Sequence, residues 1–257
     1  MALAAVVTGA TSGVGRAIAL DLLARGVRTV VVGRREHLLG TLVDEHPDAA
    51  LPLAADAADP ATARAALELL APRPDHDLLL VNAAGETGPI GPVGSVDLDW
   101  WASSTATNLL APVYFTETFV PAMMAARSGR IINVSSAQAF HPPTAIVAAY
   151  ATHKVALNFY TRCVAEQLEG TEVAAVAIHP GDVRTEIWDS IGSQADAMGE
   201  AGESLRAVVA RIMEGGGDPL DKAVELVWRL VESPAAKING TFAWIEGGIQ
   251  KPLPTDF

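Results

Sequence analysis

Short apolar runs alternate with longer helical patterns along almost the whole chain. Several of these runs are rich in Val, Leu and Ile without alternating polar residues, which is typical of strands buried on both faces of a parallel sheet. The predicted strands are Leu3–Thr8, Thr29–Gly33, Leu51–Ala54, Leu78–Asn82, Arg130–Ser135, Val173–His179 and Phe242–Ile245.

The stretches between the strands repeat apolar residues at helical spacing, and two of them carry clear start signals. Asp59 and Asp218 each precede a proline, which places a capping carboxylate before a proline at the first helical position. The long middle stretch contains Pro112 and Pro121, so we expect a kink or a break there. The predicted helices are Gly13–Arg25, Glu36–His46, Pro60–Leu70, Asp97–Arg127, Ala148–Leu168 and Pro219–Ser233.

Strand–helix alternation with right-handed crossovers predicts an α/β fold, a single doubly wound Rossmann-type domain with a seven-stranded parallel sheet flanked by helices. The chain shows no internal repeat, no low-complexity tract and no linker long enough to separate two domains. We therefore expect one domain over residues 1–257.

Composition and charge narrow the classes of partner. Apolar residues make up 50% of the chain and charged residues 19%, which excludes disorder. A net charge of -12 argues against nucleic acid, and no apolar run reaches the roughly 20 residues that span a bilayer. The lone cysteine, Cys163, rules out an internal disulfide, fits a reducing compartment and is predicted to be a packed, inert thiol. We expect a cytoplasmic protein without nucleic-acid or membrane partners.

A glycine-rich turn joins the first predicted strand to the first helix. Glycines at this place allow a tight turn, a close backbone approach to a pyrophosphate and a close helix–strand contact. The helix N-terminus beyond them offers unpaired N–H groups to the phosphates. The turn predicts a dinucleotide site, with a plain structural turn as the alternative. Its candidate cofactor-binding residues are Gly9, Thr11, Ser12, Gly13, Val14 and Gly15.

The glycine spacing, Thr-Gly-x-x-x-Gly-x-Gly, resembles that of the short-chain dehydrogenase/reductase family rather than the spacing of other dehydrogenases. Five separated motifs follow the family's order, so the resemblance covers nearly the full chain. It implies an NAD(P)-dependent oxidoreductase. Residues 1–95 would form mainly the cofactor-binding half and residues 96–257 the catalytic and substrate half, with a lid over residues 186–217.

The end of the second strand bears on the choice of cofactor. Many NAD-preferring enzymes place an acidic residue there to bind the ribose 2′-hydroxyl. This chain has Gly33 followed by Arg34 and Arg35, and a guanidinium pair suits a 2′-phosphate. NADP(H) is favoured and NAD(H) stays open. Two solvated surface arginines are the alternative, and Ser12 stands where NADP-preferring relatives often carry a basic residue.

Three further segments resemble cofactor contacts of the family. After the third strand, an aspartate matches the position whose carboxylate meets the adenine amino group. A segment after the fourth strand resembles Asn-Asn-Ala-Gly, with alanine for the second asparagine. A segment after the sixth strand resembles Pro-Gly-x-x-x-Thr, in which the valine backbone and the threonine hydroxyl would orient the nicotinamide amide. The residues implied are Asp56, Ala57, Asn82, Ala83, Ala84, Gly85, Pro180, Gly181, Val183 and Thr185.

Tyr150 and Lys154 begin a predicted helix, and their i, i+4 spacing places both side chains on one face. A free tyrosine has a pKa of about 10, which is too high for easy proton exchange near neutrality. A neighbouring ammonium and an oxidised nicotinamide both favour the phenolate, so we expect the pKa of Tyr150 to move towards neutrality. Such a pair is common by chance, so its meaning depends on the other motifs.

The family resemblance implies two more catalytic residues. Ser136, at the end of the fifth strand, would hydrogen-bond the substrate oxygen. The interval from Ser136 to Tyr150 is one residue longer than the commonest family pattern, with the extra residue expected in the 141–143 loop, so Ser135 stays an alternative. Asn108 would complete the tetrad by holding a water beside Lys154. A buried helix asparagine that satisfies a backbone group is the alternative for Asn108.

Substrate contacts are less sharply indicated. His141 could line the substrate mouth or be an exposed loop histidine, and Trp188 lies where relatives carry a mobile lid. Trp100 and Trp101 are predicted to pack in the core or at a subunit contact. No histidine spacing suggests a metal site. Residues available for an apolar wall are Trp188, Ile191, Met198, Val208, Val209 and Ile212.

The resulting hypothesis is reduction of a ketone or aldehyde by NADPH, or the reverse oxidation, with Tyr150 as general acid or base. One alternative is a catalytically silent NAD(P)-binding regulatory protein of the same fold. Another is a sugar-nucleotide epimerase or dehydratase, whose glycine spacing differs. The predicted partner is a small carbonyl or alcohol substrate, and the resemblance implies a homodimer or homotetramer.

Overall fold

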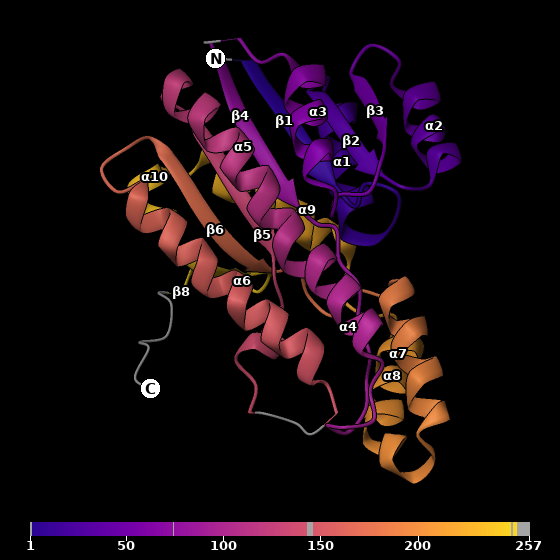
Figure 1. The fold of residues 1–257 in the computed structure, drawn as a ribbon. Helices are drawn as coiled ribbons and strands as arrows, with labels where there is room; N and C mark the ends of the chain where they lie inside the picture. Colours follow the sequence, from indigo (N-terminus) through magenta and orange to yellow (C-terminus); the bar gives the residue numbers. More distant parts are fainter. Residues whose placement is uncertain (1, 74, 143–145, 248, 251–257) are drawn as a thin grey trace.

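A computed structural model describes residues 2–73, 75–142, 146–247 and 249–250 of the chain (Figure 1). Residue 143, in the loop expected to hold the extra residue before Tyr150, lies outside the described residues.

The sheet contains the seven parallel strands that the sequence predicts, in the order β3-β2-β1-β4-β5-β6-β7. A two-residue strand, β8, pairs antiparallel with β7 at one edge. The predicted strand boundaries hold to within two residues, and β5 ends at Val134, which leaves Ser135 outside the strand. The strands are β1 Ala2–Thr8, β2 Arg28–Gly33, β3 Ala50–Ala54, β4 His76–Asn82, β5 Gly129–Val134, β6 Val173–His179, β7 Phe242–Trp244 and β8 Ile249–Gln250.

Helices cover both faces of the sheet (Figure 1). One core cluster joins the sheet to α1, α2, α9 and α10, and the other joins it to α3, α5 and α6. The helices are α1 Gly13–Ala24, α2 Glu36–Glu45, α3 Pro60–Leu70, α4 Leu98–Thr105, α5 Ala111–Ala126, α6 Ala148–Gln167, α7 Glu186–Ala197, α8 Glu203–Gly215, α9 Leu220–Glu232 and α10 Ala235–Ile238, with 3₁₀ turns at Ala137–Ala139 and Gly199–Gly202.

Neighbouring residues of each central strand point into opposite cores. In β1, Ala5 and Val7 belong to the cluster under α1 and α9, whereas Ala4 and Val6 belong to the cluster under α5. All four side chains are at most 1% exposed. Because both faces are covered, an apolar residue is required at every position, which explains the unbroken apolar runs in the sequence.

The long middle helix continues without a break. α4 continues through a π-helical turn, Ala106–Leu110, into α5, and Pro112 lies in the first turn of α5 rather than in a break. By length and composition alone, the 29-residue stretch Leu98–Ala126 could cross a membrane. Its Phe115, Phe119 and Met123 side chains are buried against the sheet, so we assign the stretch to the core. The π turn places Asn108 on the inner side of the helix, fully buried.

Of three local predictions, one is confirmed and two are wrong. Asp59 caps α3 as predicted, because its carboxylate accepts a hydrogen bond from the Ala61 N–H. Asp218 does not cap α9; the N-cap is Pro219, and the Asp218 carboxylate instead accepts a hydrogen bond from the Asp182 N–H. Cys163 is exposed on α6 rather than packed.

The expected lid is made of two helices that sequence periodicity did not single out. α7 and α8 pack against each other beyond the ends of the strands, as the orange helices of Figure 1 show. Their apolar residues are spread over short, mostly polar helices, and α7 keeps one residue buried, Ala195. Such short helices depend on tertiary contacts for their stability.

Candidate active site

A pocket of about 810 Å³ lies where the carboxyl ends of β1, β2, β4, β5 and β6 meet. The chain leaves β1 towards β2 on one side and later returns to β4 on the other, so β1 and β4 flank the point where the strand order reverses. Open α/β sheets bind ligands in the crevice at this point. The position of the pocket therefore follows from the topology of the sheet.

The glycine turn builds the floor of the pocket. Gly9 has a φ of +67°, and a Cβ there would lie 2.8 Å from the Ala83 backbone oxygen. A Cβ on Gly15 would lie 2.5 Å from the Gly9 backbone oxygen. The Thr8 hydroxyl accepts hydrogen bonds from the Ala83 and Ala84 N–H groups, which joins the ends of β1 and β4. The backbone can thus lie against a pyrophosphate at the N-terminus of α1, and the turn fits a dinucleotide.

The two arginines after β2 have different surroundings. Arg34 is 75% exposed and lies 4.0 Å from the Asp56 carboxylate. Arg35 donates two hydrogen bonds to the Thr11 hydroxyl and forms an ion pair of 2.8 Å with Glu186. Both arginines line the pocket, but only Arg34 has a guanidinium largely free to meet a phosphate. The two arginines therefore do not act as the predicted pair, because the Arg35 guanidinium already contacts Thr11 and Glu186.

Tyr150 and Lys154 face the pocket from the first turns of α6, with Lys154 Nζ 5.4 Å from the centroid of the Tyr150 ring. Burial lowers the pKa of Lys154 to about 8, and its ammonium donates a hydrogen bond to the Val134 carbonyl. Burial raises the pKa of Tyr150 to about 12; a hydrogen bond with Ser136 opposes this shift and the Asp182 carboxylate adds to it. The expected lowering of the pKa of Tyr150 is therefore wrong for the protein alone, because desolvation outweighs the hydrogen bond with Ser136.

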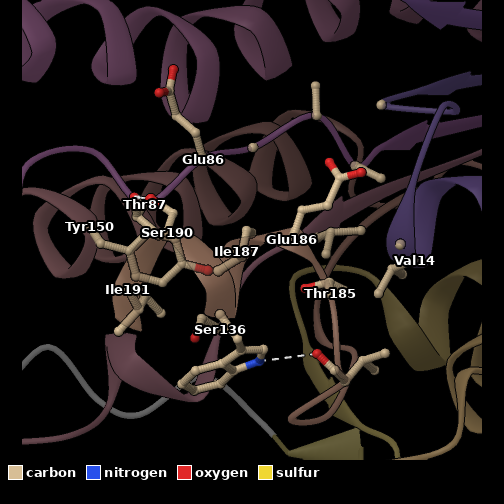
Figure 2. Close-up of a pocket in the computed structure, with 18 of the residues that line it drawn as sticks. Val14, Glu86, Thr87, Ser136, Tyr150, Thr185, Glu186, Ile187, Ser190 and Ile191 are labelled. Atoms are coloured by element: carbon tan, nitrogen blue, oxygen red, sulfur yellow. Dashed lines mark hydrogen bonds between the residues drawn. The ribbon is translucent and has the colours of Figure 1, made fainter. Parts of the chain in front are cut away.

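The two candidate serines point to different surroundings. Ser136 lies beside the Tyr150 hydroxyl (Figure 2), and its own hydroxyl accepts a hydrogen bond from the Gln138 N–H. Ser135 is 2% exposed, and its hydroxyl has no hydrogen-bond partner among the described residues. Both serines line the pocket. The contact with Tyr150 distinguishes Ser136.

Two predicted residues lie behind the pocket wall rather than on it. Asn108 is fully buried, and its carboxamide exchanges two hydrogen bonds with the backbone of Glu86. Asn82 donates a hydrogen bond to the Asn133 carboxamide, which joins the ends of β4 and β5. Neither side chain lines the pocket. Asn108 holds the backbone of Glu86, and Asn82 joins the strand ends behind the pocket wall.

Residues of α7 and α8 line the other side of the pocket. Thr185 begins α7, and its methyl group lies 3.0 Å from where a Gly13 Cβ would be. The Trp188 indole N–H donates a hydrogen bond to the Val183 carbonyl, the dashed line in Figure 2. Farther along α7, the Gln194 carboxamide accepts a hydrogen bond from the Ile90 N–H. These contacts attach α7 to the glycine turn, to the segment after β6 and to the segment after β4.

Most predicted site residues come together in this pocket. All the cofactor and catalytic candidates except Asn82 and Asn108 line it, as do His141 and Trp188. His141 is also exposed, so it sits at the mouth. Of the expected apolar wall, Trp188, Ile191 and Val208 line the pocket, and the remaining candidates do not. The residues outside the lining are Met198, Val209 and Ile212.

Sequence reasoning missed several lining residues. Glu86 follows Gly85 directly, and its carboxylate accepts hydrogen bonds from Trp100 and Thr107. Trp100 therefore lines the pocket instead of packing in the core. The sequence could have indicated Glu86, because this residue directly follows the cofactor segment that ends at Gly85. Other missed residues carry no local motif, and they include Thr87, Ile90, Gln138, Ile146, Val147, Glu186, Ile187, Ser190, Ser204, Leu205 and Arg211.

Comparisons with known proteins agree with this geometry. The model of the family described as short chain dehydrogenase matches residues 3–196. A short chain dehydrogenase of Pseudocercospora fijiensis is 35% identical over 204 residues, which are 77% of this chain and 64% of that relative. The chain thus spans less than two thirds of the length of this fungal protein.

Two further proteins match over almost their whole length. The uncharacterized oxidoreductase YvrD of Bacillus subtilis is 28% identical, and the match covers 96% of both chains. A variant of actinorhodin polyketide ketoreductase, solved with NADPH, superposes with a TM-score of 0.80 at 28% identity, over 96% of this chain and 97% of that one. The match to the ketoreductase extends over the lid and catalytic segments as well as the sheet.

Proposed function

The chain belongs to the short-chain dehydrogenase/reductase family of nicotinamide-dependent oxidoreductases, and we propose that it uses NADPH to reduce a ketone or an aldehyde to an alcohol, or catalyses the reverse oxidation. One observation carries the proposal. Ser136, Tyr150 and Lys154 line the same pocket as the glycine turn, so a carbonyl held beside Tyr150 would also lie beside a dinucleotide.

The proposed chemistry divides between cofactor and protein. The glycine turn and Arg34 would hold NADPH, which would supply a hydride for the carbonyl carbon. The Ser136 hydroxyl donates a hydrogen bond to the substrate oxygen and polarises the carbonyl. The Tyr150 hydroxyl then gives its proton to that oxygen, which completes the alcohol and leaves a phenolate.

Lys154 is suited to restore the proton on Tyr150. Burial lowers the pKa of Lys154 to about 8, so its ammonium can lose and regain a proton near neutral pH. Asn108 lies next to Lys154 across Gly85, because a Cβ on Gly85 would be 3.1 Å from Asn108 Oδ1 and 3.9 Å from Lys154 Nζ. We propose that Asn108 helps hold a water there, which would link Lys154 to solvent.

Arg34 supports the preference for NADP(H) over NAD(H). Its exposed guanidinium at the end of β2 can form charge-assisted bonds with a 2′-phosphate. No carboxylate occupies the equivalent position after Gly33 to select a free 2′-hydroxyl. The ketoreductase with a TM-score of 0.80 was solved with NADPH, which points the same way.

The substrate end of the pocket favours a moderately apolar carbonyl or alcohol. Its wall is built from the Ile90, Ile146, Ile191, Leu205 and Val208 side chains. We further propose a cytoplasmic homodimer or homotetramer formed through α4–α5 and α6. Exposed apolar side chains on these helices support the proposal: Leu110, Val155 and Phe159.

A substrate screen tests the proposal. Purified protein is incubated with NADPH and a panel of ketones and aldehydes, and with NADP⁺ and alcohols, and the absorbance of the reduced nicotinamide is followed. We expect turnover with apolar carbonyls that Tyr150→Phe abolishes. If no carbonyl or alcohol is turned over although NADPH binds, the protein is a silent cofactor-binding regulator and the proposal is wrong.

A further inference from the structure

The proposed mechanism gives no role to His153, a buried titratable residue. His153 lies on α6 between Tyr150 and Lys154 and is 2% exposed. Its ring packs edge-on against Trp101, with 6.1 Å between the ring centroids. Its two ring nitrogens reach different elements, so it connects α6 to the end of α4 and to the π-helical turn.

Hydrogen-bond directions determine the tautomer of His153. The Thr105 hydroxyl donates to the Trp101 carbonyl at 2.9 Å, so it has lone pairs available for the His153 ring 2.8 Å away. His153 therefore carries its proton on Nε2 and donates it to Thr105. The lone pair of Nδ1 then faces the Asn108 amide nitrogen at 3.4 Å. Burial and Lys154 lower the pKa of His153 to about 4, which agrees with a neutral ring.

The Asn108 carboxamide is thereby held from three directions. Its oxygen accepts a hydrogen bond of 3.0 Å from the Glu86 N–H, and its nitrogen donates one of 2.8 Å to the Glu86 carbonyl. The second amide hydrogen has only the His153 lone pair among the contacts of the described residues. Asn108 and Lys154 flank the same glycine, Gly85. The orientation of the Asn108 carboxamide therefore affects which polar atoms lie near the Lys154 ammonium.

We infer that His153 is a positioning residue, which holds Asn108 and the π-helical turn in register with Tyr150 and Lys154 in the proposed reaction. A neutral ring accepts the amide hydrogen of Asn108. A protonated ring would instead present a second donor to that amide and a positive charge to Lys154. The charged groups facing the ring are Lys154 and Glu86. The inference rests on the proposed oxidoreductase function.

Two substitutions at His153 test the roles of the two ring nitrogens separately. His153→Asn places an oxygen near the former Nδ1 and keeps an acceptor for Asn108. His153→Gln places an amide near the former Nε2, so it keeps a donor for Thr105 and loses the acceptor. We expect kcat to stay within about threefold in His153→Asn and to fall about tenfold to a hundredfold in His153→Gln, with KM nearly unchanged in both. Thermal unfolding shows whether both variants fold, and His76→Asn, at a buried histidine far from the pocket, is the control.

A second measurement does not depend on turnover. A ¹H–¹⁵N spectrum of protein labelled with ¹⁵N-histidine reports which ring nitrogen of His153 carries the proton. We expect the Nε2–H tautomer at neutral pH, unchanged when NADPH is added. An Nδ1–H tautomer, or full kcat in a folded His153→Gln enzyme, overturns the inference. Absence of turnover in the wild-type protein overturns the proposed function instead, and with it the catalytic role of His153.

Discussion

Arg35 and Glu186 form an ion pair with 2.8 Å between Nη1 and Oε1, and the pair joins the loop after β2 to the first turn of α7. The same guanidinium donates two hydrogen bonds to the Thr11 hydroxyl in the glycine turn. Arg35 thus connects the lid to the floor of the cofactor pocket. Arg34, its neighbour in sequence, remains largely exposed.

Arg34→Ala is expected to weaken NADPH binding more than NADH binding. A charge-assisted hydrogen bond contributes roughly 1.5–3 kcal/mol, so the dissociation constant of NADPH should rise about tenfold to a hundredfold, and that of NADH less than threefold. Fluorescence titration of the reduced cofactors measures both. Arg64→Ala, at an exposed site on α3, controls for the lost charge. Equal losses for the two cofactors would remove the preference for NADP(H).

Glu186→Gln is expected to strengthen NADPH binding about twofold to fivefold. The change removes a negative charge beside the phosphate region and frees Arg35. Two charges near a protein surface interact with an energy of about 1 to 4 kcal/mol. Stability should change by less than about 1 kcal/mol, because the pair is substantially exposed. Asp189→Asn, in the same helical turn, makes the same change in charge. An identical effect of the two substitutions would show that the ion pair itself is irrelevant.

Tyr150→Phe is expected to lower kcat by about a hundredfold to ten-thousandfold, because the variant keeps the ring but lacks the proton donor. The dissociation constant of NADPH should stay within a few-fold. Stopped-flow measurement of nicotinamide absorbance and a binding titration give the two quantities. Full activity of the folded variant would exclude Tyr150 as the acid.

Ser136→Ala and Ser135→Ala should differ. Ser136 contacts Tyr150, so its loss is expected to lower kcat about tenfold to a hundredfold. Ser135 has a buried hydroxyl without a described partner, so alanine should cost little activity and leave stability equal or slightly higher. Steady-state kinetics of both variants measures the loss of kcat, and thermal unfolding measures the change in stability. The reverse order of rate losses would make Ser135 the working hydroxyl.

Acid should destabilise the protein in part through His153. The pKa of His153 is lowered to about 4 in the folded chain, against about 6.5 when unfolded, so the unfolded chain binds the proton more readily between these values. This contribution to the free energy of unfolding is present above pH 6.5 and is lost as the pH falls through the folded-state pKa of about 4, by roughly 3 kcal/mol in total. Urea unfolding at pH 7.5 and pH 4.5 measures it. His153→Asn should remove this part of the decline, and an undiminished decline would contradict the assignment.

The sequence by itself determined the architecture and the positions of the main motifs. Apolar runs without polar alternation predict strands buried on both faces, and alternation with helices then requires parallel strands. Because parallel strands bring their carboxyl ends to one edge, Gly9, Asn82, Ser136 and Pro180 had to lie together. Local features, such as the Asp59 cap and the Tyr150–Lys154 spacing, could be read directly because they involve neighbours within one helix turn.

Only the tertiary structure decided how those residues are used. The division of roles between Arg34 and Arg35 depends on Glu186, which lies 151 positions farther along the chain. The raised pKa of Tyr150 depends on burial, which no local spacing reveals. His153 has no recognisable motif and acquires its hydrogen bonds only where α6 packs against the π-helical turn. Contacts between distant segments arise from packing, so residue types and spacings alone do not determine them.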